Sequence, residues 1–407
     1  MHIDFYYDIV CPYAYLASTQ IDTIAARHGA EVRWHPVLLG GIFRSIGGPQ
    51  VPMQAMSAPR ARHNVLDLQR WADLFGCPLA FPTEHPRRTV ETMRLLVATP
   101  AALRPALSKR LYRAYWVDGQ DLADRDTLDA IARAFNIDPA VIDSDAAREG
   151  LFETTQAAVE LGAFGVPAFG VNGHFYWGQD RLHFVEKALG APREHNALPP
   201  LQPKQRLRFY HDFSSPFSYL ASTQIERVAR EMDAELIWCP ILLGGLFRSI
   251  GTADVPLFEM STPKRAYMAK DLRDWADWWG VPFRFPDHFP IRSITALRVS
   301  IVAPQLTPTL YRAAWADNRP IDDPTVLADL IESAGLDAAD VLAATKTNIV
   351  KQQIRRLTQQ AEDVGACGVP TFEIVGHEAR ESILIWGQDR LAMLTQALAG
   401  WRPQTAQ

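Results

Sequence analysis

The sequence predicts an α/β fold that is built twice in tandem. Residues 5–16 read FYYDIVCPYAYL and residues 209–220 read FYHDFSSPFSYL, so one pattern returns after 204 positions. In each repeat a strand, a helix and a second strand come first, which favours a parallel βαβ unit. A helical stretch and a β-hairpin follow. A repeat of about 200 residues is too long for a solenoid unit and fits two fused globular domains.

The opening elements are predicted from residue type. The strand segments are rich in aromatic and branched side chains. The helix between them is expected to begin at Pro12 and Pro216, because proline suits the first helical turn. The predicted strands occupy residues 3–7, 31–36, 207–210 and 235–240.

The middle of each repeat is predicted to be helical, because apolar residues recur there at helical spacing. GVPAF at residues 165–169 and GVPTF at 368–372 then lead into a strand and a hairpin. WGQDRL follows at 177–182 and 386–391, before a last helix. In the first repeat the helical segments are 61–75, 89–98, 105–117, 125–135 and 146–161.

The predicted domain boundaries follow from the repeat. Copy one covers residues 1–191 and copy two covers residues 206–402. Residues 192–205 contain four prolines and several polar residues, which is typical of a linker.

The composition excludes several classes of protein. The net charge of −5 and the pI near 6.1 argue against a nucleic-acid partner. No apolar run reaches the roughly 18 residues that a membrane span needs. The first residues enter a strand-like segment, so we expect no signal peptide. None of the four cysteines (Cys11, Cys77, Cys239 and Cys367) is repeated in the other copy. We therefore expect reduced thiols in a cytoplasmic protein.

The main difference between the two opening motifs is the residue before the proline, Cys11 in copy one and Ser215 in copy two. A helix N-terminus offers unpaired N–H groups and a partial positive charge, which stabilise a thiolate. Ser215 is a poor nucleophile, but its hydroxyl can donate a charge-assisted hydrogen bond to a bound thiolate. Cys11 would bring its own sulfur. Ala14 stands where a dithiol oxidoreductase carries its second cysteine, so copy one lacks the thiol for intramolecular exchange.

Taken together, these motifs resemble the thioredoxin fold with a helical insertion, as in the DsbA-like superfamily. The similarity is greatest to the 2-hydroxychromene-2-carboxylate isomerases and the kappa-class glutathione transferases. It rests on Asp-x-x-Cys/Ser-Pro, on LLGGxFRSIG at residues 38–47 and 242–251, and on the GVP and WGQDRL segments. These motifs cover both copies from end to end.

The resemblance implies a glutathione site in each copy. The residue before the first proline would meet the glutathione sulfur, and the proline after Gly-Val would be cis. The backbone beside it would pair with the tripeptide, a basic residue would meet a carboxylate, and an Asp would receive the γ-glutamyl amine. In copy two these residues are Ser215, Lys264, Val369, Pro370 and Asp389; in copy one they are Cys11, Arg60, Val166, Pro167 and Asp180.

Simpler interpretations stand beside these assignments. An Asp near a helix start, as at Asp180 and Asp389, is also explained by capping. Lys264 and Arg60 could be solvated charges at a helix end, and Cys11 could be a buried helix-cap residue. The histidines show no metal-ligand spacing such as His-Glu-x-x-His, so we predict no metal.

Three functions are consistent with the sequence. The leading hypothesis is a glutathione-dependent isomerase that acts on a small electrophilic or conjugated substrate, with Ser215 stabilising the glutathione thiolate. The second is a thiol–disulfide oxidoreductase or glutathione transferase that uses Cys11. The third is a non-catalytic glutathione-binding or scaffolding protein. Copy one departs further from the family pattern, with Arg60 for a lysine and His63 for the tyrosine that corresponds to Tyr267. The two copies are expected to pack as a pseudo-dimer within the chain.

Overall fold

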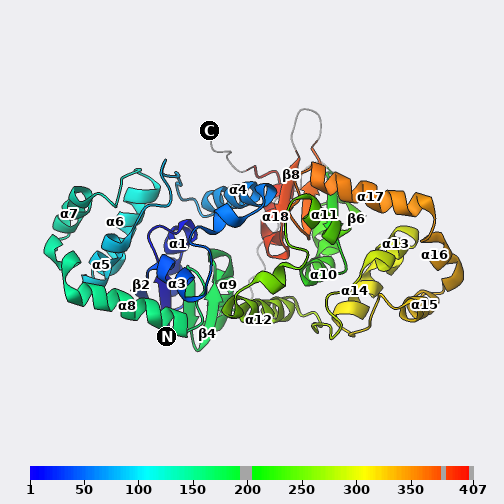
Figure 1. Cartoon of the computed structure of the whole chain (residues 1–407), viewed down its shortest axis with the longest axis horizontal. Helices are drawn as coiled ribbons and strands as arrows, with labels where there is room; N and C mark the ends of the chain where they lie inside the picture. Colours follow the sequence, from blue (N-terminus) through cyan, green and yellow to red (C-terminus); the bar gives the residue numbers. More distant parts are fainter. Residues whose placement is uncertain (193–203, 377–381, 403–407) are drawn as a thin grey trace.

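The computed structural model describes residues 1–192, 204–376 and 382–402. The two copies lie beside each other along the long axis of the molecule, each with its own sheet and its helical insertion at the outer end (Figure 1). Most of the predicted linker, 192–205, lies outside the described residues. The predicted duplicated α/β fold is confirmed.

Each copy contains a four-stranded mixed sheet. The strand order is β2-β1-β3-β4 in copy one and β6-β5-β7-β8 in copy two. The first two strands of each copy pair in parallel, as the βαβ pattern predicted, and the hairpin strands join antiparallel. The strands are β1 (His2–Tyr7), β2 (Glu31–Pro36), β3 (Ala168–Val171), β4 (His174–Trp177), β5 (Arg206–His211), β6 (Glu235–Pro240), β7 (Thr371–Ile374) and β8 (Ile383–Trp386).

Most helices of copy one agree with the predicted segments to within a few residues, but the helix over residues 39–45 was not predicted and the first helix differs. The helix after Pro12 is broken at Thr19 and Gln20, although copy two carries the same Ser-Thr-Gln-Ile sequence in one continuous helix. The helices are α1 (Pro12–Ser18), α2 (Ile21–Arg27), α3 (Leu39–Ser45), α4 (Ala58–Leu74), α5 (Val90–Ala98), α6 (Arg104–Trp116), α7 (Arg125–Ala134), α8 (Asp145–Glu160) and α9 (Leu182–Ala188).

Copy two repeats this order. Its helices are α10 (Pro216–Glu231), α11 (Leu243–Ser249), α12 (Thr262–Trp279), α13 (Ile294–Val302), α14 (Thr307–Trp315), α15 (Pro324–Ser333), α16 (Ala338–Ala344), α17 (Asn348–Asp363) and α18 (Leu391–Leu398). No helix in the described part of the chain is both long and apolar enough to cross a membrane.

Two long helices join the copies. Helix α4 of copy one lies beside α18 and β8, and helix α12 of copy two lies beside α9 and β4 (Figure 1). On α12, the Trp275 ring lies 5.1 Å from that of Phe184 in α9. On α4, the Arg70 guanidinium donates a 2.7 Å hydrogen bond to the carbonyl of Leu384 in β8. A long helix of each copy therefore packs against the other copy.

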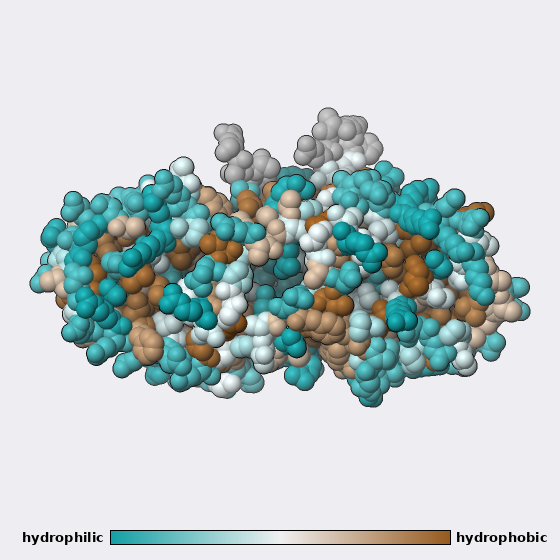
Figure 2. Space-filling model, in the orientation of Figure 1, coloured by the Kyte–Doolittle hydropathy of each residue, from teal (hydrophilic) through white to brown (hydrophobic). Residues whose placement is uncertain are grey.

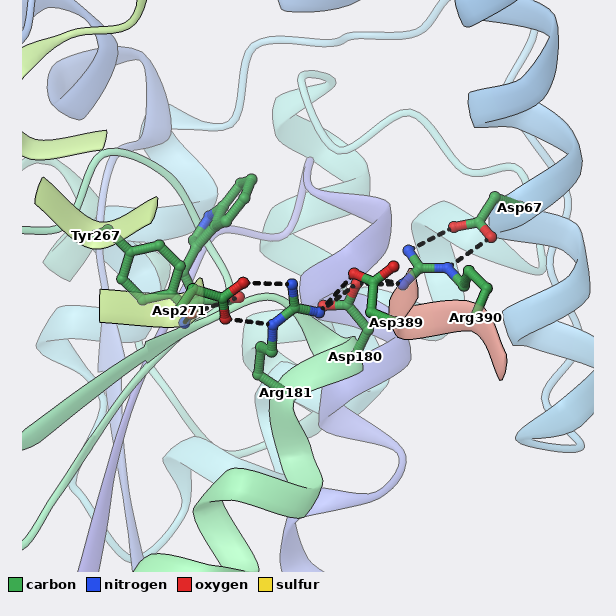
Figure 3. A network of polar contacts seen from close by, with 8 residues as sticks. Asp67, Asp180, Arg181, Tyr267, Asp271, Asp389 and Arg390 are labelled. Carbon is green, nitrogen blue, oxygen red and sulfur yellow. Dashed lines mark hydrogen bonds and ion pairs between the residues drawn. The ribbon is translucent and has the colours of Figure 1, made fainter. Parts of the chain in front are cut away.

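A buried ion-pair network lies at the centre of this interface (Figure 3). The Arg181 guanidinium of copy one makes two hydrogen bonds, of 2.7 and 2.9 Å, to the Asp271 carboxylate of copy two. The Arg390 guanidinium of copy two makes two bonds of 2.9 Å each to Asp67 of copy one. The Arg181–Asp271 pair and the Arg390–Asp67 pair therefore occupy equivalent positions in the two copies.

Asp180 and Asp389 lie between the two guanidinium groups (Figure 3). The Asp180 carboxylate is 3.1 Å from Arg181 Nη1 and 2.8 Å from Arg390 Nη1. Asp389 is 2.9 and 3.1 Å from the same two nitrogens. Burial alone would raise the pKa of Asp180, but the two guanidinium groups outweigh it and hold that pKa below its usual value. Both arginines are therefore shared between the copies.

Removal of either arginine should loosen the interface. Arg181→Ala and Arg390→Ala would each leave buried carboxylates without their countercharge, so we expect each to lower the free energy of unfolding by roughly 3–5 kcal/mol. Urea unfolding measures the change. Arg227→Ala, which breaks the exposed Arg227–Glu231 pair, is the matched control and should cost less than about 1 kcal/mol. Equal effects for all three variants would contradict this role.

Candidate functional site

Cys11 and Ser215 occupy equivalent positions at the start of a helix, each facing a proline loop. The Cys11 thiol lies 3.2 Å from the Val166 carbonyl, and the Ser215 hydroxyl lies 3.4 Å from the Val369 carbonyl. The Val166–Pro167 and Val369–Pro370 peptide bonds are cis, as the family resemblance predicted. The tertiary structure thus brings together segments that are about 155 residues apart in the sequence.

Ser215 and Cys11 differ in how their side chains interact with the helix that each precedes. The Ser215 Oγ accepts a 3.2 Å hydrogen bond from the Ser218 amide, so it caps helix α10. Cys11 makes no side-chain cap bond, and its helix α1 has only seven residues. Serine is a favoured N-cap residue because its oxygen satisfies a free amide of the first turn. Ser215 is therefore held with its oxygen against the helix N-terminus.

The sequence-based expectation of a stabilised thiolate at Cys11 is wrong for this arrangement. The side chain is 5% exposed. Burial and the charge of Asp8 raise the pKa of Cys11 to about 12, and the nearby amides only partly offset this effect. Cys11 is thus a neutral thiol at physiological pH.

Asp8 and Asp212 support the two sites, a role that sequence analysis missed. The Asp8 carboxylate is buried and accepts hydrogen bonds from the Leu39 amide at 2.9 Å and from the Thr89 hydroxyl at 2.9 Å. Asp212 accepts in the same way from the Leu243 amide at 2.8 Å. Each Asp therefore ties the strand that leads into the site to the helix that follows the second strand, α3 or α11, and Asp8 also contacts the start of the helical insertion through Thr89. An Asp three residues before Cys or Ser in both copies was the available signal.

The basic residues Lys264 and Arg60 reach across the interface, and the assignment of each to the glutathione site of its own copy stays a prediction. Lys264 Nζ of copy two lies 5.7 Å from the centre of the Trp177 ring of copy one. The Arg60 guanidinium of copy one lies 5.5 Å from the Trp386 ring of copy two. Each tryptophan lies against the glycine before a cis proline, because a Cβ on Gly165 or Gly368 would come within 3.0 Å of its Nε1. The tryptophan beside each proline loop is thus contacted by a cation from the other copy.

Tyr267 and His63 likewise contact a tryptophan of the other copy. The Tyr267 hydroxyl accepts a 3.0 Å hydrogen bond from the Trp177 amide in the other copy. The His63 ring meets Trp386 edge to face, with 5.6 Å between ring centres. Burial lowers the pKa of His63 to about 4, so its imidazole is neutral at physiological pH. The copy-one histidine and the copy-two tyrosine therefore pack in corresponding places.

The backbone beside each cis proline retains a free donor. No hydrogen bond from the Val166 or Val369 amide occurs within the described ranges. Both residues are 5% exposed. A buried amide without a partner is unusual in a folded protein and is a place where a ligand backbone can bind.

Asp180 and Asp389 do not stand free beside the loops but belong to the interdomain network. Gly178 and Gly387 precede them with φ of 103° and 111°, and a Cβ at either position would lie within 2.5 Å of the Asp carboxylate. Only glycine fits there. The structural role of these carboxylates has no signal in the local sequence, because each contacts arginines from both copies.

The described residues contain no group of three or more His, Cys, Asp or Glu side chains that could hold a metal ion. Hydrophilic residues cover much of the face seen in Figure 2, and that face is hollowed at the junction of the copies.

The charge of Asp8 should make the stability depend on pH. Burial raises its pKa from 3.8 to about 6, so the folded protein holds the proton more tightly than the unfolded chain does. The resulting stabilisation is complete below the unfolded pKa and is lost as the pH rises through about 6. From about pH 4 to 7, wild type should lose roughly 2–2.5 kcal/mol of unfolding free energy relative to Asp8→Asn. Urea unfolding at several pH values tests this, and a constant difference would contradict it.

Comparison with known proteins places this arrangement in a family. The DSBA-like thioredoxin domain matches residues 2–190 and again 206–399. A 2-hydroxychromene-2-carboxylate isomerase of Pseudomonas sp. (strain C18) is 32% identical over 193 residues, 46% of this chain and 90% of that protein. Glutathione S-transferase kappa 2 of Caenorhabditis elegans is 26% identical over 207 residues, 47% of this chain and 91% of that protein.

A solved structure of 2-hydroxychromene-2-carboxylate isomerase shares 28% identity, with a TM-score of 0.41, and covers 47% of this chain and 95% of that one. Each of these relatives spans about half of this chain. The relatives are named as isomerases and transferases, which are enzymes. The chain belongs to the DSBA-like thioredoxin family and carries its domain twice.

Proposed function

We propose that the protein is a glutathione-dependent isomerase that acts on a small conjugated substrate at the Ser215 site. The observation that carries this proposal is the Ser215 hydroxyl, which caps helix α10 and makes only a long 3.4 Å contact with the Val369 carbonyl. Such a hydroxyl can turn its proton toward a bound thiolate at little cost. The relatives named 2-hydroxychromene-2-carboxylate isomerase support this reaction class.

The chain offers donors and acceptors that fit glutathione. The free Val369 amide would pair with the tripeptide backbone, and Arg60 from copy one would meet a carboxylate near Trp386. The interdomain network holds four carboxylates against two guanidinium groups, so its excess negative charge would favour the γ-glutamyl ammonium at Asp389. In copy one, Val166, Pro167 and Asp180 would bind in the same way, with Lys264 supplied by copy two.

Bound glutathione would supply a thiolate that adds reversibly to an electrophilic carbon of the substrate. The protein's part is to stabilise that sulfur through Ser215 and the first-turn amides of α10. The buried setting of these donors strengthens their effect on the charge. We also propose a cytoplasmic location, where glutathione and the free thiols Cys11, Cys77, Cys239 and Cys367 would remain reduced.

Ser215→Ala tests the role of the hydroxyl. With 2-hydroxychromene-2-carboxylate and glutathione, we expect kcat to fall by about 10²–10³-fold, the usual cost of removing one donor to a developing charge. Spectrophotometry of the isomerisation measures it. Ser215→Cys places the copy-one residue at the same position, and Cys11→Ala should leave the rate nearly unchanged. A Ser215→Ala enzyme with full activity would exclude the proposal.

The contacts that Arg60 and Lys264 make with the opposite copy give an independent test. Arg60→Ala should weaken glutathione binding at the Ser215 site by about tenfold, because it removes a charged hydrogen-bond partner. Lys264→Ala is the matched control and should affect only the copy-one site. Calorimetric titration with glutathione of both variants, each in a Cys11→Ala background, would separate the effects at the two sites. A larger effect of Lys264→Ala at the Ser215 site would show that the basic residues serve their own copies.

The second candidate, thiol chemistry at Cys11, is disfavoured by the burial of this thiol and by its pKa of about 12. Because only the thiolate reacts, we expect iodoacetamide at pH 8 to alkylate Cys11 at least about 100-fold more slowly than free cysteine. Mass spectrometry of the modified peptide gives the rate. Alkylation as fast as that of free cysteine, or rapid trapping by oxidised glutathione, would restore this candidate.

A further inference from the structure

Copy two contains a cavity of about 210 Å³ that is separate from the Ser215 site. It lies between strand β6 and the helical insertion, where residues of α13, α14 and α17 line it. This volume far exceeds the roughly 10–15 Å³ that a single water requires. Its lining includes His211, Trp238, Ser300, Ile301 and Thr307, and also the side chains of Cys239 and Gln353.

In copy one an arginine fills the corresponding space. The Arg104 guanidinium donates to four backbone carbonyls, those of Trp34 at 3.1 Å, Leu96 at 2.9 Å, Val97 at 3.2 Å and Thr99 at 3.1 Å. Three of these acceptors lie at the C-terminal end of helix α5, where carbonyls lack helical partners and carry partial negative charge. In copy one, Arg104 thus supplies hydrogen-bond donors to the free carbonyls at the C-terminal end of α5.

Copy two lacks this arginine because its helix begins one turn later. Helix α6 has 13 residues and α14 has nine, and both end at a tryptophan whose Nε1 donates a 2.8 Å bond to the loop after the first strand. Counting back from that tryptophan, Ser108 corresponds to Thr307, the first residue of α14. The turn that holds Arg104 is replaced by the short 3-10 turn Pro304–Leu306.

The carbonyl acceptors, however, are still present in copy two. Helices α5 and α13 have nine residues each and begin at equivalent positions, so Leu96 and Val97 correspond to Ser300 and Ile301. Within the described part of the chain, no hydrogen bond reaches the carbonyl of Ser300 or Ile301. Trp238 pairs with Phe209 in the same register as Trp34 with Phe5. The carbonyls of Ser300 and Ile301 therefore lack the donor that their counterparts have in copy one, whereas that of Ala303, the counterpart of Thr99, accepts from the Leu306 amide at 3.0 Å.

A buried histidine adds a further unpaired group. Tyr7 of copy one reaches across to Ser108, with 2.5 Å between the two hydroxyl oxygens. Its counterpart His211 is fully buried, and its Nδ1 lies 2.9 Å from the Tyr311 hydroxyl. The other ring nitrogen, Nε2, has no partner among the described residues. Burial lowers the pKa of His211 to about 3, so the ring is neutral and can accept a hydrogen bond from a cation.

We propose that this cavity binds a small free guanidinium compound, whose N–H groups replace the donors that Arg104 supplies in copy one. The ligand would donate to the carbonyls of Trp238, Ser300 and Ile301 and to His211 Nε2. A planar guanidinium has the fork of donors that such a set of acceptors needs, whereas an ammonium is a compact point charge. The small volume favours a free molecule over an arginine of a bound protein.

The test uses the full chain and methylguanidinium as the probe. Ligand-observed NMR should show saturable binding at one site, and methylammonium at the same concentration should bind at least tenfold more weakly. His211→Tyr and Ser300→Leu place the copy-one residues into the cavity, so each should weaken binding at least tenfold. Arg104→Ala opens the same space in copy one. This variant should have a lower Tm, bind a second equivalent and regain more Tm with methylguanidinium than wild type does.

The outcomes separate the alternatives. No saturable binding, or binding that His211→Tyr and Ser300→Leu leave unchanged, would overturn the proposal, as would equal binding of methylammonium. Stronger binding of a blocked arginine peptide than of methylguanidinium would overturn the assignment to a free molecule. If His211→Tyr does not fold, Ser300→Leu provides the same test from the opposite wall. Glutathione turnover is not part of the readout, so failure here leaves the proposed isomerase untouched.

Discussion

The structure depends on one buried set of charges at the junction of the two copies. Arg181 and Arg390 each bind an Asp of the opposite copy and share Asp180 and Asp389 between them. A buried charge is costly unless it is paired and hydrogen-bonded, so while the interface is closed each arginine requires carboxylates from both copies. Since the same WGQDRL segments approach the cis-proline loops, the interface and the candidate sites are held by the same residues.

Duplication has left the two copies with different chemistry on one scaffold. At the helix start, copy one presents a buried neutral thiol and copy two a capping hydroxyl. Beneath the helical insertion, copy one closes its helix end with Arg104, whereas copy two leaves a cavity lined by His211. Each difference comes from one residue or one helical turn. The two copies thus differ in local chemistry while the shared fold stays intact.

Much of the fold and the core of the candidate site could be predicted from the sequence. The repeat, the parallel βαβ unit and the helical middle follow from patterns of neighbouring residues, and the structure confirms them. Cys11 and Ser215 could be placed at a helix start because proline follows each of them. The cis state of Pro167 and Pro370 came from the family resemblance and is also confirmed.

The sequence by itself determined the fold of each copy, because strand and helix patterns are local and each copy contains a full set. Only the tertiary structure decided which residues of one copy contact the other. Lys264 and Arg60 cross the interface, and Asp180 and Asp389 join a network of both copies. It also decided the state of Cys11, because burial raises the pKa of a thiol against the helix N-terminus. Burial and contacts between distant segments depend on packing, which no local pattern records.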